Sequence, residues 1–204
     1  WARNMVTALA RIDGRAVGIV ANQPRHLGGV LDAQGSEKAA RFVHFCNDFG
    51  VPLVAVVDTP GFMPGSKQEQ AGVIRHGASL VRAFAAARVP KLTVVLRKNY
   101  GGAYITMNSR DLGADLVLAW PDAEMGIMGA RAAVGIVNRR ELRAAEDPEA
   151  ERDRLADEYA EAHLGAQSAA AEGFVDEIIE PIETRDRLAW ALRSFTSQDR
   201  DLRS

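Results

Sequence analysis

Apolar and polar residues alternate near the start of the chain and predict a β-hairpin. Residues 6–12 and 15–22 have the composition of strands, and Asp13-Gly14 lies between them. That dipeptide readily adopts the positive φ angles of a tight two-residue turn. The chain is therefore expected to begin in a sheet.

An amphipathic helix is predicted after the next loop. Apolar residues from Ala39 to Phe49 recur at helical spacing, with Ser36 as the expected N-cap and Gly50 as the stop. One side of this helix is expected to pack on the core.

Two later segments follow one plan of strand, glycine turn and helix. Residues 51–61 and 89–102 each open with Val-Pro, run through an apolar strand and end in glycine. Helices are predicted to follow them, at about 68–87 and 103–110. Crossovers of this length join parallel strands, so the pattern predicts a right-handed parallel α/β arrangement.

The last part of the chain continues with shorter elements. Strands are predicted at residues 114–120, 125–128 and 175–179, with an amphipathic helix at the end. Residues 139–163 are the most charged stretch and keep only a narrow apolar stripe. They predict an exposed helical arm, either solvated or docked on another subunit.

Composition narrows the class of protein. The chain has 204 residues, 47% of them hydrophobic, which suits one domain. A net charge of -2 gives no electrostatic reason to expect nucleic acid or a membrane as partner. The single cysteine, Cys46, favours a reducing, cytoplasmic compartment. The chain opens on Trp1 and goes directly into a strand-like pattern, so it is expected to be a piece of a longer polypeptide.

Side chains that carry most enzyme chemistry form no motif in this sequence. It contains no Gly-x-Ser-x-Gly elbow, no paired cysteines and no His-x-x-x-His, and its four histidines are scattered. The spacing of Asp58, His76 and Ser79 does not support a catalytic triad. No metal site is expected, and backbone groups are left as the candidates.

Glycine turns offer backbone N–H groups instead. Gly61, the pair Gly101-Gly102 and Gly129 each follow a predicted strand, and the last two open helices. Free N–H groups at a helix start suit a developing oxyanion, so we predict that those of Gly102 and Ala103 form an oxyanion hole. Glycine at such turns can also serve only close packing or a positive φ, and the spacing does not decide between the two.

Five segments, in this order, closely resemble one enzyme family: "VANQP", "DTPGFMPGSKQEQAGVIRHGASL", "VPKLTVVLRKNYGGAY", "WPDAEMGIMGARAAVGI" and "ADEYAEAH". The family is the carboxyltransferase (beta) subunit of biotin-dependent acyl-CoA carboxylases, and the chain resembles its C-terminal domain over about residues 2–192. The resemblance implies a crotonase-like α/β fold, a ββα superhelix, for residues 1–204.

The resemblance also implies a reaction. Carboxybiotin, carried on a partner, would give its carboxyl group to the α-carbon of an acyl-CoA, and Gly102 and Ala103 match the backbone pair that holds the ureido oxygen of biotin. The basic ureido nitrogen can itself take the α-proton, so the family needs no catalytic side chain here. The residues implied to line the substrate and biotin site are Gly61, Phe62, Gly101, Ile105, Gly129 and Ala130.

The chain departs from the family pattern in two respects. Propionyl-CoA-type members usually carry Asp directly after "GGAY", where this chain has Ile105, as members that accept acetyl-CoA or longer chains do. Ile105 is implied to shape the pocket wall, although a core position on the new helix would also explain it. The family's N-terminal domain, which holds most of the CoA, is absent.

Assembly is implied by the same resemblance. The family's active site lies between the N-terminal domain of one subunit and this domain of another, in a ring of six beta subunits with a biotin carboxylase and carrier (alpha) subunit as partner. The isolated 204 residues are therefore expected to have little or no activity.

Three other functions stay open at this point. A free-standing enoyl-CoA hydratase or isomerase would need acidic groups, and Glu124 is the only obvious acid near a glycine turn. A biotin-dependent decarboxylase subunit would use the same domain in the reverse direction. A non-catalytic oligomerisation module would use residues 139–163 as its docking arm.

Overall fold

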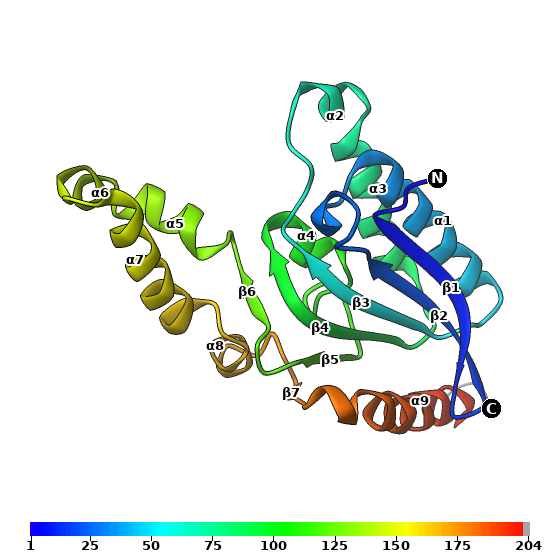
Figure 1. Cartoon of the computed structure of the whole chain (residues 1–204). Coiled ribbons are helices and arrows are strands. Elements are labelled where there is room, and N and C mark those ends of the chain that lie inside the picture. The colour runs from blue at the N-terminus through cyan, green and yellow to red at the C-terminus, as the bar shows by residue number, and fades with distance from the viewer. Residues whose placement is uncertain (202–204) are drawn as a thin grey trace.

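A hairpin followed by parallel strands forms the sheet on which the rest of the chain is built (Figure 1). The structure is a computed structural model; it describes the backbone of residues 1–201 and side chains as far as residue 195. The strands are β1 Met5–Ile12, β2 Arg15–Asn22, β3 Leu53–Thr59, β4 Lys91–Tyr100, β5 Leu116–Ala119, β6 Glu124–Gly126 and β7 Glu177–Ile178. Their order in the sheet is β1-β2-β3-β4-β5-β7, and β6 pairs with the end of β4.

Helices fill most of the connections between these strands. The α-helices are α1 Ala33–Asp48, α2 Ser66–Gln70, α3 Val73–Ala86, α4 Gly101–Thr106, α5 Ala130–Val137, α6 Arg139–Ala144, α7 Pro148–His163, α8 Ala166–Ala171 and α9 Thr184–Asp201. Two short 3-10 helices, η1 Leu27–Gly29 and η2 Pro181–Glu183, complete the described elements.

The predicted hairpin is confirmed. β1 and β2 pair antiparallel with Ile12 opposite Arg15, and Asp13 and Gly14 between them have φ angles of 50° and 77°. The predicted parallel arrangement is confirmed as well, because β2, β3, β4 and β5 pair parallel in that order.

Both faces of the sheet are covered, α1 and α3 lying on one side and α9 on the other (Figure 1). Ala55 and Val57 of β3 belong to the core cluster beneath α1 and α3. Val54, with its side chain on the opposite face, belongs to the second cluster, together with Leu188 and Leu192 of α9. This alternation explains why β3 reads as one continuous apolar run.

Three predicted details of the helices are wrong. The N-cap of α1 is Asp32, whose carboxylate accepts the Gly35 N–H at 2.7 Å, while Ser36 is buried inside the helix. The helix predicted at 68–87 is split into α2 and α3 by Gly72, at φ 80°. The helix predicted at 103–110 begins at Gly101 and ends at Thr106, and Asn108 at φ 63° prevents its continuation.

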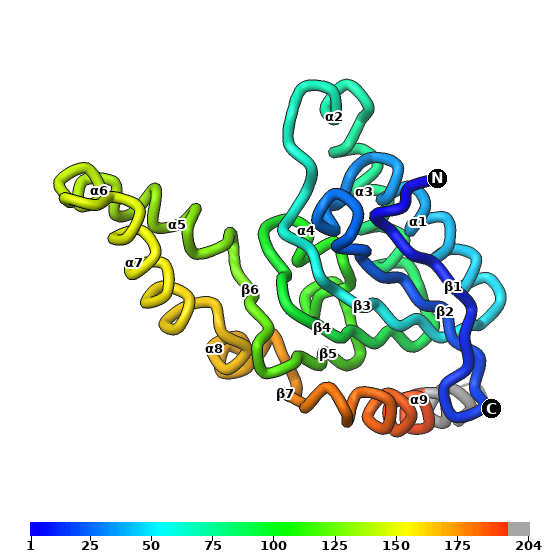
Figure 2. Tube along the Cα trace, in the orientation of Figure 1, coloured from blue at the N-terminus to red at the C-terminus, as the bar shows by residue number. Residues whose placement is uncertain are grey.

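The charged stretch at 139–163 contains α6 and α7, which lie with α5 to one side of the sheet (Figure 2). Leu155 and Tyr159 of α7 pack against Val134 of α5 and Leu142 of α6 in a small cluster of their own. At the other end of the chain, α9 returns to the hairpin, where Arg193 Nη1 is 2.7 Å from Asp13 Oδ2.

Two glycine substitutions test the packing. A Cβ at Gly18 of β2 would overlap the Cys46 sulfur of α1, so we expect Gly18→Ala to lower the free energy of unfolding by about 1–3 kcal/mol. At Gly135 of α5 a Cβ would meet nothing within 4 Å. Gly135→Ala should therefore raise the free energy of unfolding by about 0.5–1 kcal/mol, because alanine has the higher helix propensity. Urea unfolding of both variants measures this, and equal effects would contradict the described packing.

Candidate functional site

The carboxyl ends of β3 and β4 bring two glycine turns together. The strands are parallel, with Val57 beside Val95 and, after a shift in register, Thr59 beside Asn99. The loop that leaves β3 is fixed by Leu31, which donates its N–H to Gly61 O at 2.9 Å and accepts the Met63 N–H at 2.7 Å. Gly61 and Phe62 therefore meet the turn that opens α4.

Phe62 packs against two glycines. A Cβ at Gly77 of α3 would lie 2.9 Å from the Phe62 ring, and one at Gly102 of α4 would lie 3.5 Å from it. The ring thus lies against α3 and the start of α4. Its position excludes a side chain at Gly77, whereas a Cβ at Gly102 would make an ordinary van der Waals contact with it.

The start of α4 presents backbone donors. Gly101 has a φ angle of 61°, and the N-cap residue, Tyr100, makes no side-chain cap. The first N–H groups of a helix have no partner within it. Gly102 is exposed, whereas Ala103 is fully buried, with 0% of its surface accessible. Of the predicted pair, only Gly102 is exposed in this structure.

Tyr100 connects this turn to Gly129 and Ala130 at the start of α5. The Tyr100 ring lies 3.3 Å from the position of a Gly129 Cβ, and its hydroxyl donates to the Glu124 carboxylate. Burial raises the pKa of Tyr100, and the bond to Glu124 adds to the rise. Glu124, the candidate acid, is therefore engaged by a neutral phenol.

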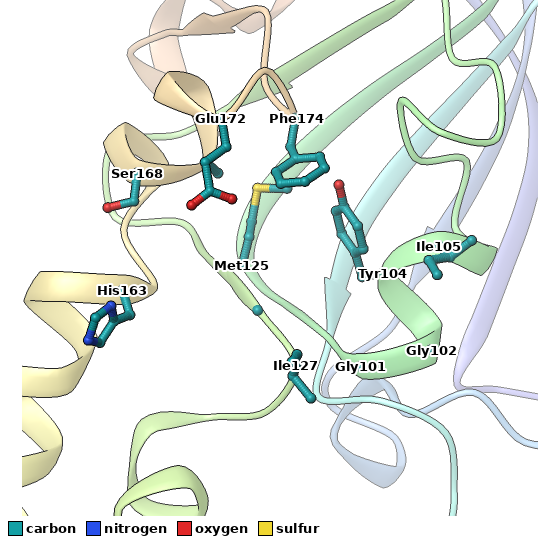
Figure 3. Close-up of a pocket in the computed structure, with 12 residues that line it drawn as sticks. Gly101, Gly102, Tyr104, Ile105, Met125, Ile127, His163, Ser168, Glu172 and Phe174 are labelled. Carbon is teal, nitrogen blue, oxygen red and sulfur yellow. The ribbon is translucent and has the colours of Figure 1, made fainter.

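A cavity of about 440 Å³ opens beside the α4 turn (Figure 3). Three of the predicted residues line it, namely Gly101, Gly102 and Ile105; the other predicted residues do not. The lining that sequence reasoning missed includes Tyr104, Met125, Ile127 and Phe174. Most of this wall is apolar, and Tyr104 and Phe174 meet edge to face with ring centroids 5.9 Å apart.

Residues at the end of α7 and in and just after α8 line the far side of the cavity. Their position is fixed through β6, because Met125 N donates to Leu164 O at 2.8 Å and Gly126 has no side chain to collide with Leu164. These contacts bring His163, Ser168 and Glu172 to the cavity. No local sequence signal marked them.

Other chemistry is not supported by the geometry. The Asp58 carboxylate is buried and accepts two bonds from the Arg97 guanidinium, at 2.8 and 2.7 Å, which ties the end of β3 to β4. The residues that the structure describes contain no group of three His, Cys, Asp or Glu that could hold a metal ion. Among the same residues, no helix is both long and apolar enough to cross a membrane.

Comparison with known proteins gives consistent matches. A family model described as carboxyl transferase domain matches residues 1–203. The 12S subunit of methylmalonyl-CoA carboxyltransferase from Propionibacterium freudenreichii subsp. shermanii is 52% identical over 198 residues, 97% of this chain and 38% of that protein. The biotin-dependent acetyl-/propionyl-coenzyme A carboxylase beta6 subunit of Mycobacterium tuberculosis is 54% identical over 196 residues, 94% of this chain and 41% of that protein. The chain thus spans about two fifths of the length of these relatives.

A solved structure agrees with these matches. The transcarboxylase 12S crystal structure, described as a hexamer with methylmalonyl-coenzyme A and methylmalonic acid bound, is 52% identical and has a TM-score of 0.90. The match covers 96% of this chain and 38% of that one. It confirms the predicted crotonase-like α/β fold.

Two side chains, Tyr104 at the site and Cys46 in the core, predict that the protein loses stability at alkaline pH. Burial raises the pKa of Cys46 to about 11, and burial with the charges of Asp111 and Glu172 raises that of Tyr104 to about 12. In the unfolded chain these groups ionise near about 8.5 and 10. The folded state therefore keeps protons that the unfolded state releases, so the free energy of unfolding falls as pH rises from about 9 towards 12.

Urea unfolding at a series of pH values measures this fall. We expect Tyr104→Phe to flatten the curve above about pH 10 and Cys46→Ala to flatten it from about pH 9. A wild-type stability that stays constant or rises over this range would contradict the burial of both groups.

Proposed function

This chain belongs to the carboxyl transferase domain family, and we propose on that basis that it forms the biotin-side half of an acyl-CoA carboxyltransferase. The reaction is carboxyl transfer from carboxybiotin, carried on a partner subunit, to the α-carbon of an acyl-CoA of the acetyl-/propionyl-CoA type. Because the chain spans about two fifths of its relatives, the activity belongs to the subunit that contains it.

The observation that carries the proposal is the exposed Gly102 at the start of a helix without a side-chain cap, beside a cavity of about 440 Å³. A planar ureido group fits this turn because Gly101 and Gly102 present no side chain. A cavity of this size is within the range of about 300–1,000 Å³ that is usual for small ligands.

The backbone of α4 would stabilise negative charge. Biotin, when bound through its carrier, supplies the carboxyl group and a ureido oxygen on which charge develops as that group leaves. The Gly102 N–H, at the positive end of the helix dipole, would donate to that oxygen. The Ala103 N–H would be the second donor once the turn opens enough to expose it. The apolar side chains of Ile105 and Met125 would keep water from the site.

The remaining predicted positions would act around this turn. Phe62, fixed by Gly61, would hold the entrance of α4 in place, and Gly129 with Ala130 would support it through Tyr100. No metal, nucleic acid or membrane enters the proposal. The related transcarboxylase is described as a hexamer, and a homohexamer is proposed for the full-length subunit too, with a cytoplasmic location and a biotin carboxylase and carrier subunit as partner.

A hydratase or isomerase has less support. Glu124, the acid that such a reaction would need, is bound to the Tyr100 hydroxyl and lies outside the cavity. A purely structural module would not need an open amide beside an apolar cavity.

Removal of one backbone donor tests the proposal. Ala103→Pro deletes an N–H in the first helical turn, where proline is tolerated, and Ala103→Gly keeps that N–H while losing the methyl group. In the complete subunit with its biotinylated partner, we expect the proline variant to lower kcat by about 100-fold or more and the glycine variant to retain most activity. Equal kcat values for the two variants would mean that the Ala103 N–H does not contribute to the oxyanion hole.

Substrate choice at Ile105 gives a second test. Ile105 lines the cavity and is 46% exposed, so Ile105→Asp changes the wall that faces the substrate. We expect kcat/KM to shift towards propionyl-CoA by about tenfold relative to acetyl-CoA and a long-chain acyl-CoA, while Ile105→Val shifts it little. An unchanged ratio in the Asp variant would show that Ile105 does not contact the acyl group.

A further inference from the structure

The cavity beside α4 is not apolar throughout. Met125 and Phe174 form an apolar middle, whereas hydroxyl and carboxylate groups lie at the end away from Gly101 and Gly102 (Figure 3). The polar side chains at that end are Tyr104, His163, Ser168 and Glu172. They come from α4, α7 and α8, so the chain has to fold completely before they face one space.

The Tyr104 side chain lines the cavity and carries an unpaired hydroxyl group. Its oxygen is buried and has no hydrogen-bond partner. Figure 3 shows this oxygen on the side of Phe174 and Glu172, away from the glycine turn. Buried hydroxyl groups in folded proteins are nearly always paired, and an unpaired one in a cavity wall is ready to bond to whatever enters.

Glu172 adds a carboxylate to the same end. The residue is exposed and lines the cavity, and within the part of the chain that the structure describes its carboxylate makes no ion pair and no hydrogen bond. An ionised carboxylate only accepts hydrogen bonds. Burial, and after it the charges of Asp111 and Glu172, raise the pKa of Tyr104, so this phenol is protonated and able to donate. One end of the cavity therefore offers an acceptor and a donor together.

We propose that Tyr104 and Glu172 select acyl-CoA substrates whose acyl chain carries a neutral hydrogen-bonding group, such as a hydroxyl, and discriminate against chains that end in a carboxylate. A hydroxyl can donate to Glu172 and accept from Tyr104, whereas a carboxylate meets the like charge of Glu172. The cavity is continuous with the Gly102 turn, so a chain whose reacting end lies at the turn can reach these groups through the apolar middle. This inference rests on the proposed carboxyl transfer, and it assigns the acyl group to the cavity.

Equilibrium binding to the complete subunit tests the inference without turnover. The probes are valeryl-CoA, its terminally hydroxylated analogue and glutaryl-CoA, followed by the corresponding six-carbon set to vary the reach. We expect the hydroxylated chain of at least one set to bind about fivefold to tenfold more tightly than the plain chain. The dicarboxylate should bind about tenfold more weakly than the hydroxylated chain.

Single substitutions separate the two contacts. Tyr104→Phe should remove most of the preference for the hydroxyl, and Glu172→Gln should restore binding of the dicarboxylate towards that of the plain chain. Glu161→Gln, an exposed carboxylate on α7 outside the cavity, is the matched control and should change neither ratio.

Two results would overturn the inference. Equal affinities within both sets would mean that the polar end does not contact the acyl chain. Variants that alter KM for the biotinylated partner while leaving acyl-CoA binding unchanged would assign the cavity to biotin instead. Failure of the proposed function is a different result, namely no carboxyl transfer with any acyl-CoA, and the binding ratios are measurable in either case.

Discussion

The site depends on how closely Phe62 approaches two backbones. Its ring lies where a side chain at Gly77 would be and packs against Gly102, so the loop after β3, helix α3 and the start of α4 share one contact. That contact is possible only because parallel strands end at the same edge of the sheet. The Asp58–Arg97 ion pair, with a buried carboxylate, holds the two strand ends together below it.

The same edge explains why backbone rather than side chains carries the proposed chemistry. Two carboxylates at the strand ends are already engaged, Asp58 by Arg97 and Glu124 by Tyr100. Gly102 is exposed next to a largely apolar cavity, where a backbone donor interacts more strongly with charge than it would in water. Rigid strands fix that amide, which suits stabilisation of a developing anion.

The local sequence pattern predicted the central strands and helices well, but it predicted the residues at which the helices begin and end poorly. Asp13-Gly14 determines its turn through local backbone preference alone. The two apolar segments that open with Val-Pro likewise predict parallel strands. The break at Gly72 escaped prediction because the apolar period continues across it, and Asp32 was overlooked because it lies before that period begins. Tyr104 and Glu172 share a wall only because β6 holds the end of α7 and the start of α8 in place, a long-range arrangement that no spacing in the sequence reveals.

The central claim is that the α4 turn binds the ureido oxygen of biotin. An experimental structure of the complete subunit with bound biotin tests this most directly. The account predicts the ureido oxygen within hydrogen-bonding distance of the Gly102 N–H, about 2.7–3.2 Å, with the Ala103 amide uncovered beside it. Biotin bound elsewhere, or a thioester oxygen at this turn, would contradict it.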